Sequence, residues 1–93
     1  MPEKAPPFAR YLNERVVVDT LSRYVYLGRL TAATRTELVL ADADVHDLGD
    51  GASSRDIYVL GARSDGIHEN RREVAVRLDV VISVSRLDDV ITY

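Results

Sequence analysis

Apolar residues recur along this chain in short runs that have the alternating period of β-strands. The last two runs, Glu73–Val76 and Val80–Val84, are rich in β-branched residues and are separated by the polar hinge Arg77-Leu78-Asp79. Three earlier runs of the same character predict partner strands over Glu14–Leu21, Tyr24–Thr34 and Thr36–His46. About five short strands with short connections predict a small barrel or sandwich with helical caps.

Two of the predicted strands should bend. Gly28 lies in the middle of the second strand and indicates a bulge, a sharp bend or the close passage of another backbone. In Thr36–His46 the apolar positions change face near Leu40–Ala41. Bends of this kind allow one strand to take part in both layers of a small barrel.

The N-terminal segment Phe8–Leu12 has helical rather than strand spacing. Phe8, Tyr11 and Leu12 lie at positions i, i+3 and i+4, and Pro7 suits the first turn of a helix. The pattern predicts one or two helical turns, which are too short to be stable without packing against the body of the protein.

A second short helix is predicted over Ser54–Ser64, where the period changes after the glycine-rich segment Asp47–Ala52. Ser53 or Ser54 can cap this helix, and Asp65-Gly66 can end it. A strand over Asp56–Leu60 remains an alternative, because Ile57, Tyr58 and Val59 favour strands.

The length and composition predict a single domain. The chain has 93 residues, of which 46% are hydrophobic. Residues 1–7 contain three prolines and predict a flexible lead-in, which leaves residues 8–93 for the domain. A core this small, without any cysteine, suggests that partner subunits add buried surface.

The chain lacks the apolar segments that membrane proteins and secretory leaders carry. No run approaches the roughly 18 apolar residues of a membrane helix. The N-terminus, MPEKAPPFAR, has no apolar signal core. We therefore predict a cytoplasmic protein without a membrane partner.

The net charge of −3 hides an uneven distribution. Residues 1–35 carry six basic and three acidic side chains, whereas residues 36–56 carry one basic and six acidic side chains. Nucleic-acid affinity comes mainly from neutralising phosphates, so an acidic chain needs a local basic face to bind RNA or DNA.

Two motifs, in this order after the N-terminal helical segment, carry a family resemblance. The first is Leu27-Gly28-Arg29-Leu30, preceded by Tyr26, and the second is Val76-Arg77-Leu78-Asp79-Val80-Val81, followed by Ile82-Ser83-Val84. Over Phe8–Val84 the chain resembles the Sm and Sm-like (LSm) family, as a divergent member of the bacterial type. The resemblance implies a mainly β fold, a small five-stranded bent antiparallel barrel of the SH3-like kind, with an N-terminal helix and a short inserted helix.

The resemblance also implies an assembly and a ligand. Members of the family form homo-oligomeric rings, in which the fourth strand of one subunit pairs with the fifth strand of the next. The family binds single-stranded RNA through the loop after the second strand and the segment after the fourth. The corresponding residues here are Thr34, Arg35, Glu37, Arg77 and Asp79.

Three of these positions, and Leu78 beside them, depart from the family pattern. Thr34 stands where the family has Asp, and Glu37 stands near its Asn, although an ionised carboxylate only accepts hydrogen bonds and repels phosphate. Leu78 replaces the usual glycine, which predicts strain if the position needs a positive φ. Arg35 replaces the base-stacking side chain of the family and can stack through its guanidinium plane.

Each candidate site residue also has a purely structural interpretation. Arg77 either contacts a base or phosphate, or pairs with Asp79 or Glu73. Glu37 is either a recognition residue or a simple loop carboxylate.

Two further groups of polar residues have both a binding and a structural interpretation. Asp42, Asp44 and His46 alternate along one strand face with a spacing that suits a divalent cation, but a solvated strand end has the same pattern. Asn70 with Arg71-Arg72 either contacts phosphate or forms a solvated turn.

No catalytic constellation is visible in the sequence. There is no cysteine, no serine with a histidine in a recognisable setting and no glycine-rich phosphate loop. We therefore predict a non-enzymatic, ring-forming Sm-like module without cofactor or metal, whose ligand is single-stranded RNA. The alternative is an oligomeric scaffold or protein-interaction domain that has lost RNA binding.

Overall fold

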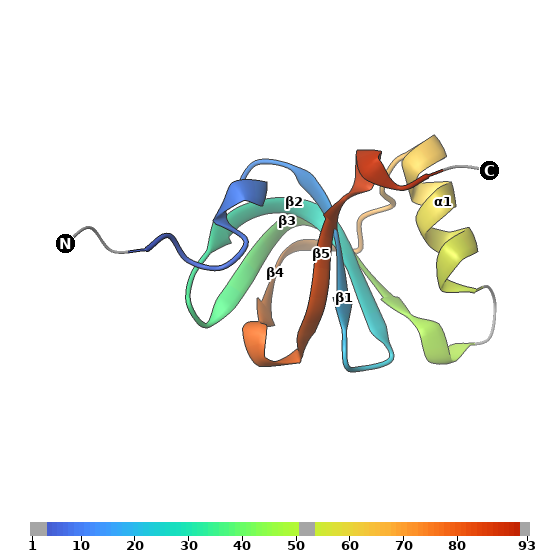
Figure 1. Ribbon diagram of the computed structural model, residues 1–93. Helices are drawn as coiled ribbons and strands as arrows, with labels where there is room; N and C mark the ends of the chain where they lie inside the picture. The colour runs from blue at the N-terminus through green and yellow to red at the C-terminus, as the bar shows by residue number, and fades with distance from the viewer. Residues whose placement is uncertain (1–3, 51–53, 92–93) are drawn as a thin grey trace.

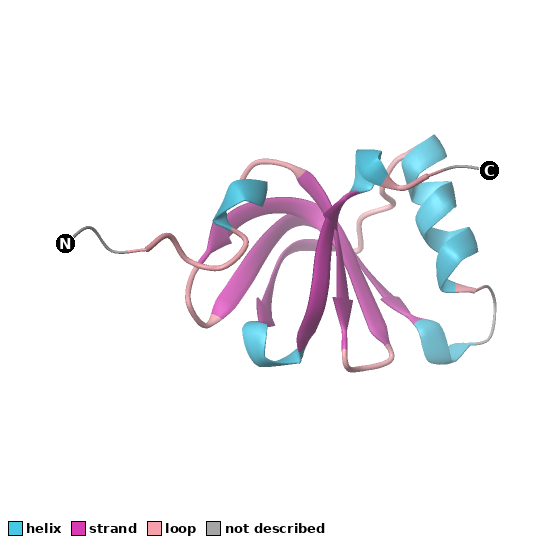
Figure 2. Cartoon of the chain, in the orientation of Figure 1, coloured by secondary structure: helices cyan, strands magenta, loops and turns pink. Residues whose placement is uncertain are grey.

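The chain folds into one strongly curved antiparallel sheet (Figures 1 and 2). The computed structural model describes residues 4–50 and 54–91. The sheet contains five strands in the order β4-β3-β2-β1-β5. Their bounds are β1 Arg15–Thr20, β2 Tyr24–Ala33, β3 Glu37–Asp47, β4 Arg71–Arg77 and β5 Val81–Arg86. The predicted number and positions of the strands are therefore confirmed, and β4 and β5 form the two edges.

The sheet bends where β2 and β3 cross at Gly28. A Cβ atom at this position would lie 3.1 Å from the Ala41 carbonyl oxygen and 3.1 Å from Leu40 Cβ, so only glycine lets the two backbones approach this closely. The β2–β3 register shifts between Leu27 and Arg29. On β3, Asp42 has a φ of 50°. Both predicted bends are confirmed.

The two faces of the sheet bury separate apolar clusters. Alternation along β1 sends Val16 and Val18 to one face and Val17 to the other. The inner cluster, which the curved sheet encloses, consists of Val16, Val18, Leu30, Leu38, Leu40, Ala43, Val76 and Val84. The outer cluster consists of Val17, Val25, Leu27, Val59, Ala62 and Leu87. Val59 and Ala62 come from an α-helix that covers this face.

That helix, α1, spans Arg55–Asp65 and confirms the helical prediction over the strand alternative. Ser54 caps it by accepting a hydrogen bond from the Ile57 amide at 3.3 Å. Gly66 ends it with a φ of 94°, and its amide donates to the Ala62 carbonyl at 2.9 Å. Although Val59 is β-branched, its burial against the outer cluster outweighs its small cost in a helix.

The remaining helical segments are single 3-10 turns: η1 Ala9–Tyr11, η2 Leu48–Asp50, η3 Leu78–Val80 and η4 Leu87–Asp89. The predicted N-terminal helix is thus reduced to η1, because Phe8 before it has a φ of 66° and Leu12 after it is extended. Phe8 and Tyr11 still pack against the inner cluster, as their spacing predicted. Within the described ranges no helix is long and apolar enough to cross a membrane.

Candidate nucleic-acid interface

The turn between β2 and β3 is held in shape by Thr34. Its Oγ1 accepts hydrogen bonds from the amides of Thr36, at 3.2 Å, and Glu37, at 3.0 Å. The Thr34 amide donates to the Glu37 carbonyl at 2.9 Å. Side chains of this kind stabilise turns by accepting from nearby amides. Thr34 therefore positions the turn rather than offering its oxygen to a ligand.

The turn η3 after β4 packs beside the β2–β3 turn. The Leu78 amide donates to the Thr36 carbonyl at 2.9 Å and joins the two segments. Leu78 lies in a 3-10 turn and is not among the described residues with positive φ. The strain predicted at this position is absent, so the leucine that replaces glycine is accommodated at no backbone cost.

These two turns enclose a shallow hollow of about 250 Å³. It is lined by Arg35, Thr36, Arg77, Leu78 and Asp79, which come from segments about forty positions apart in the chain. Figure 1 shows the two turns side by side, at the end of the barrel away from α1.

The structure therefore brings three of the five predicted site residues, Arg35, Arg77 and Asp79, to one hollow. Glu37 lies directly opposite Arg77 in the β3–β4 register. Thr34 shapes the turn beside them.

Both arginines of the hollow already have a partner within the chain. Arg77 pairs with Asp79 at 2.5 Å, one of the two partners considered from the sequence. Their side chains are 80% and 59% exposed, and ion pairs this exposed contribute at most about 1 kcal/mol. Arg35 donates to the Lys4 carbonyl at 2.6 Å. Contacts this exposed can be exchanged for contacts with a ligand.

Asp42, Asp44 and His46 do not all share one strand face, so the structure does not support the cation-binding interpretation. Asp42 has a positive φ and is exposed, which breaks the alternation. Asp44 is buried, and the His46 ring stacks on Tyr58 with centroids 3.8 Å apart. No cluster of three potential metal ligands occurs within residues 4–50 and 54–91.

A partly buried polar network around Asp44, which the sequence did not reveal, fixes α1 to the sheet. The Tyr58 hydroxyl donates to Asp44 Oδ2 at 2.5 Å, and Asn70 Nδ2 donates to Asp44 Oδ1 at 2.9 Å. Burial, and after it the hydrogen bond to Asp44, raise the pKa of Tyr58 above its ordinary value of 10.0. Asn70 also accepts from the Val45 amide at 3.0 Å. These contacts give Asn70 a structural role in place of the phosphate contact considered above.

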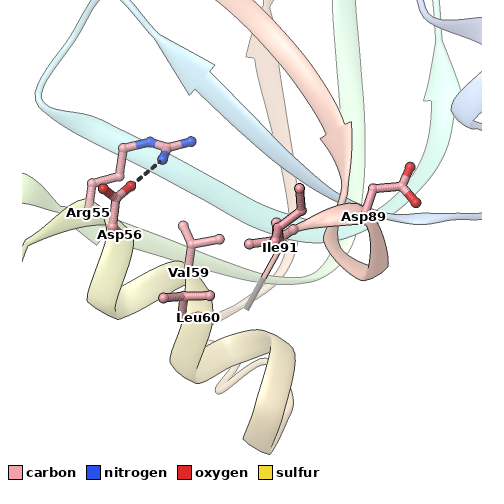
Figure 3. Close-up of a pocket in the computed structure, with 7 residues that line it drawn as sticks. Arg55, Asp56, Val59, Leu60, Asp89 and Ile91 are labelled. Atoms are coloured by element: carbon pink, nitrogen blue, oxygen red, sulfur yellow. Dashed lines mark hydrogen bonds and ion pairs between the residues drawn. The ribbon is translucent and has the colours of Figure 1, made fainter. Parts of the chain in front are cut away.

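At the opposite end of the barrel, a larger hollow of about 500 Å³ lies between α1 and the C-terminal segment (Figure 3). Its cation, Arg55, makes two hydrogen bonds to Asp19, at 2.5 and 2.6 Å, which raise its pKa. Arg55 also contacts Asp56 at 3.2 Å. The other lining residues are mainly apolar or acidic, namely Val59, Leu60, Asp89, Val90 and Ile91. This hollow does not have the chemistry of a phosphate site.

One comparison with known proteins decides the fold. A solved structure described as the Pyrococcus abyssii Sm protein in complex with a uridine heptamer superposes on this chain with a TM-score of 0.55. The match covers 83% of this chain and 87% of that one, with 22% sequence identity. The fold is Sm-like.

Sequence comparisons add nothing to this result. No family model matches the chain, and no curated protein matches it. Membership of the bacterial type therefore stays a prediction.

Proposed function

We propose that this chain is a non-enzymatic, ring-forming Sm-like module that binds single-stranded RNA at the hollow between the β2–β3 turn and η3. The observation that carries the proposal is the convergence of Arg35 and Arg77 on that hollow. A second hollow, lined by Arg15 and Arg29, also contains two carboxylates, Asp42 and Glu69, whereas the proposed site contains one, Asp79. The cytoplasmic location of the protein remains a prediction.

The side chains of the hollow suit a base with its phosphate. Arg77 offers charge-assisted hydrogen bonds, and Arg35 presents a planar guanidinium on which a base can stack. Asp79 can accept from a base edge once Arg77 turns to the ligand. The structurally similar Pyrococcus protein was solved with a uridine heptamer, which supports RNA as the ligand class to test first.

The proposed ring follows from the two edges of the sheet. Strands β4 and β5 each pair with a neighbour on one side only, so each presents a row of backbone donors and acceptors on the other. Antiparallel pairing of β4 in one copy with β5 in the next satisfies both rows. Because the two edges differ, the contact is head-to-tail, and it forms a closed ring when the rotation between neighbouring copies divides a full turn.

The charges at the hollow favour one competing function, an oligomeric scaffold or protein-interaction domain. Arg77 is paired with Asp79, and the Glu37 carboxylate faces the same strand end. A scaffold needs the two sheet edges and has no requirement for unpaired cations at the hollow.

RNA titration separates the two functions. We expect the full chain to bind a fluorescent uridine-rich oligonucleotide at moderate salt, measured by anisotropy. Arg77→Ala should weaken binding at least about tenfold, because a hydrogen bond to a charged group contributes about 1.5–3 kcal/mol. The matched control Arg63→Ala removes one cation from α1 and should bind like wild type.

Two results would contradict RNA binding at this site. No detectable binding by the wild-type chain would favour the scaffold. Equal losses in Arg77→Ala and Arg63→Ala would mean that charge alone, and not the hollow, attracts RNA.

A further inference from the structure

Arg35 is held by a backbone carbonyl from the N-terminal segment. Its Nη2 atom donates a hydrogen bond to the carbonyl oxygen of Lys4 at 2.6 Å, across 31 positions of the chain. The Arg35 side chain is exposed, and at the same time it lines the hollow between the β2–β3 turn and η3. One residue therefore joins the N-terminal segment to the proposed binding site.

The direction of this hydrogen bond leaves the two faces of the guanidinium free. The N–H donors of arginine lie in the plane of the group, so an acceptor at normal geometry lies near that plane as well. A base stacks on the face of the guanidinium instead. In the described part of the chain no aromatic ring lies over Arg35. A base can therefore stack on Arg35 while the hydrogen bond to Lys4 stays in place.

The segment that supplies the carbonyl is short and stiff. Pro6 and Pro7 have a fixed φ, which restricts the path of the backbone between Lys4 and Phe8. Phe8 packs against the inner cluster, and the Pro6 carbonyl accepts a hydrogen bond from the Ala9 amide at 3.2 Å. The segment is thus anchored at one end, and its other end reaches the β2–β3 turn.

We propose that the Lys4 carbonyl positions Arg35 as a stacking platform for a base of the RNA. This inference rests on the RNA site proposed above and adds a positioning role for the N-terminal segment. An unrestrained arginine side chain has many rotamers, and fixing it on binding costs conformational entropy. The hydrogen bond to Lys4 removes part of this cost in advance, so the ligand meets a platform that is already oriented.

Two full-length variants separate the carbonyl of Lys4 from its charge. The first, Pro6→Gly with Pro7→Gly, makes the segment flexible but keeps every charge and the Lys4 carbonyl. The second, Lys4→Ala, removes the ammonium group but keeps the carbonyl and both prolines. A positioning role of the backbone predicts a different result for each variant.

The experiment measures by anisotropy the affinity for a uridine-rich oligonucleotide and for an abasic oligonucleotide of the same length. We expect the double glycine variant to bind the uridine-rich oligonucleotide about threefold more weakly, because a flexible segment holds Arg35 less often. Its affinity for the abasic oligonucleotide should match that of wild type, since no base is present to stack. Lys4→Ala should weaken both oligonucleotides equally, because its charge acts on phosphate.

A double-mutant cycle tests whether the segment acts through Arg35. In the Arg35→Ala background, the two glycine substitutions should cause no further loss of affinity for the uridine-rich oligonucleotide. An equal loss with and without Arg35 would overturn the positioning role.

The other outcomes separate this inference from the RNA site itself. A wild-type chain that binds no RNA would overturn the proposed site and the positioning role together. A wild-type chain that binds, with affinity unchanged or raised in the double glycine variant, would overturn the positioning role alone. Equal losses for the uridine-rich and abasic oligonucleotides would also overturn it. If the double variant has a lower free energy of unfolding, Pro6→Gly alone gives the same comparison, with weaker binding expected and unchanged binding contradicting the role.

Discussion

The two ends of this small barrel are built differently. At the α1 end, Tyr58 and Asn70 hydrogen-bond to the buried Asp44, and Val59 and Ala62 pack in the outer cluster. At the other end, the β2–β3 turn and η3 are joined by a backbone hydrogen bond and carry exposed charged side chains.

This difference in construction assigns folding stability mainly to one end of the barrel and ligand binding to the other. Buried apolar surface and satisfied buried polar groups account for most of the energy of folding, so substitutions in the outer cluster at the α1 end should lower the free energy of unfolding. The exposed groups of the other end contribute little to folding and can change partners. Substitutions at the two ends should therefore affect different measurements.

The largest effect should come from Leu27→Ala, because Leu27 is fully buried in the outer cluster beneath α1. Removing a buried leucine side chain costs about 2–5 kcal/mol through lost transfer energy and the cavity left behind. Urea unfolding measures the change. Leu21→Ala is the control, since Leu21 is 75% exposed, and it should shift stability by less than about 0.5 kcal/mol. Equal effects would contradict a core at this end.

Tyr58→Phe should be the next largest change. The variant keeps the ring but leaves Asp44 without one donor, and a buried carboxylate that loses a hydrogen bond costs about 1–3 kcal/mol. Tyr24→Phe is the control on an exposed tyrosine and should be nearly neutral.

The same residue predicts an alkaline pH dependence. Because folding raises the pKa of Tyr58, the folded state holds this proton more tightly than the unfolded state. Its contribution to stability is complete below the unfolded pKa of about 10 and declines as pH rises above that value. Urea unfolding at a series of pH values should show a shallower decline for Tyr58→Phe than for wild type. Parallel curves would show that Tyr58 is not linked to folding.

Gly61→Ala should stabilise the protein slightly. A Cβ at Gly61 meets nothing within 4 Å, and the residue lies inside α1. Alanine is favoured over glycine in a helix by about 0.5–1 kcal/mol. A rise in the melting temperature checks this. Loss of stability would mean that the helix surface is covered in the assembled protein.

Arg77→Ala should have the smallest effect on stability, below about 0.5 kcal/mol, because its pair with Asp79 is exposed. Its effect on RNA binding should be among the largest, which is the reverse of the expectation for Tyr58→Phe. A comparison of both variants in chemical unfolding and in RNA titration tests the division between the ends. If Arg77→Ala lowered the free energy of unfolding, Arg77 would have a structural role at the end of the barrel away from α1, which would contradict this division.

Local patterns in the sequence were sufficient for the strands and the helix. Alternation located the strands, Gly28 marked the bend, and Ser54 with Gly66 marked the ends of α1. The resemblance located the two turns that meet at the hollow, where Arg35 and Arg77 lie together.

Features that depend on backbone detail or on distant contacts were not predictable. The positive φ of Asp42 shifts the alternation of β3 by one residue; the change of face near Leu40–Ala41 indicated a bend, but not the residue that makes it. Strain at Leu78 was expected if the glycine that it replaces had a positive φ, but Leu78 lies in η3 and is not among the described residues with positive φ. The bond between Tyr58 and Asp44 joins residues 14 positions apart, and its partner Asn70 lies 26 positions from Asp44. The packing of α1 brings Tyr58 to Asp44, and the pairing of β3 with β4 brings Asn70 there.

Hydrogen–deuterium exchange of the full chain with and without a uridine-rich oligonucleotide tests most directly which end binds. The account predicts slower exchange in residues 34–37 and 77–80 when RNA is added, with exchange in α1 unchanged. Protection confined to α1, or no protection at saturating RNA, would contradict it.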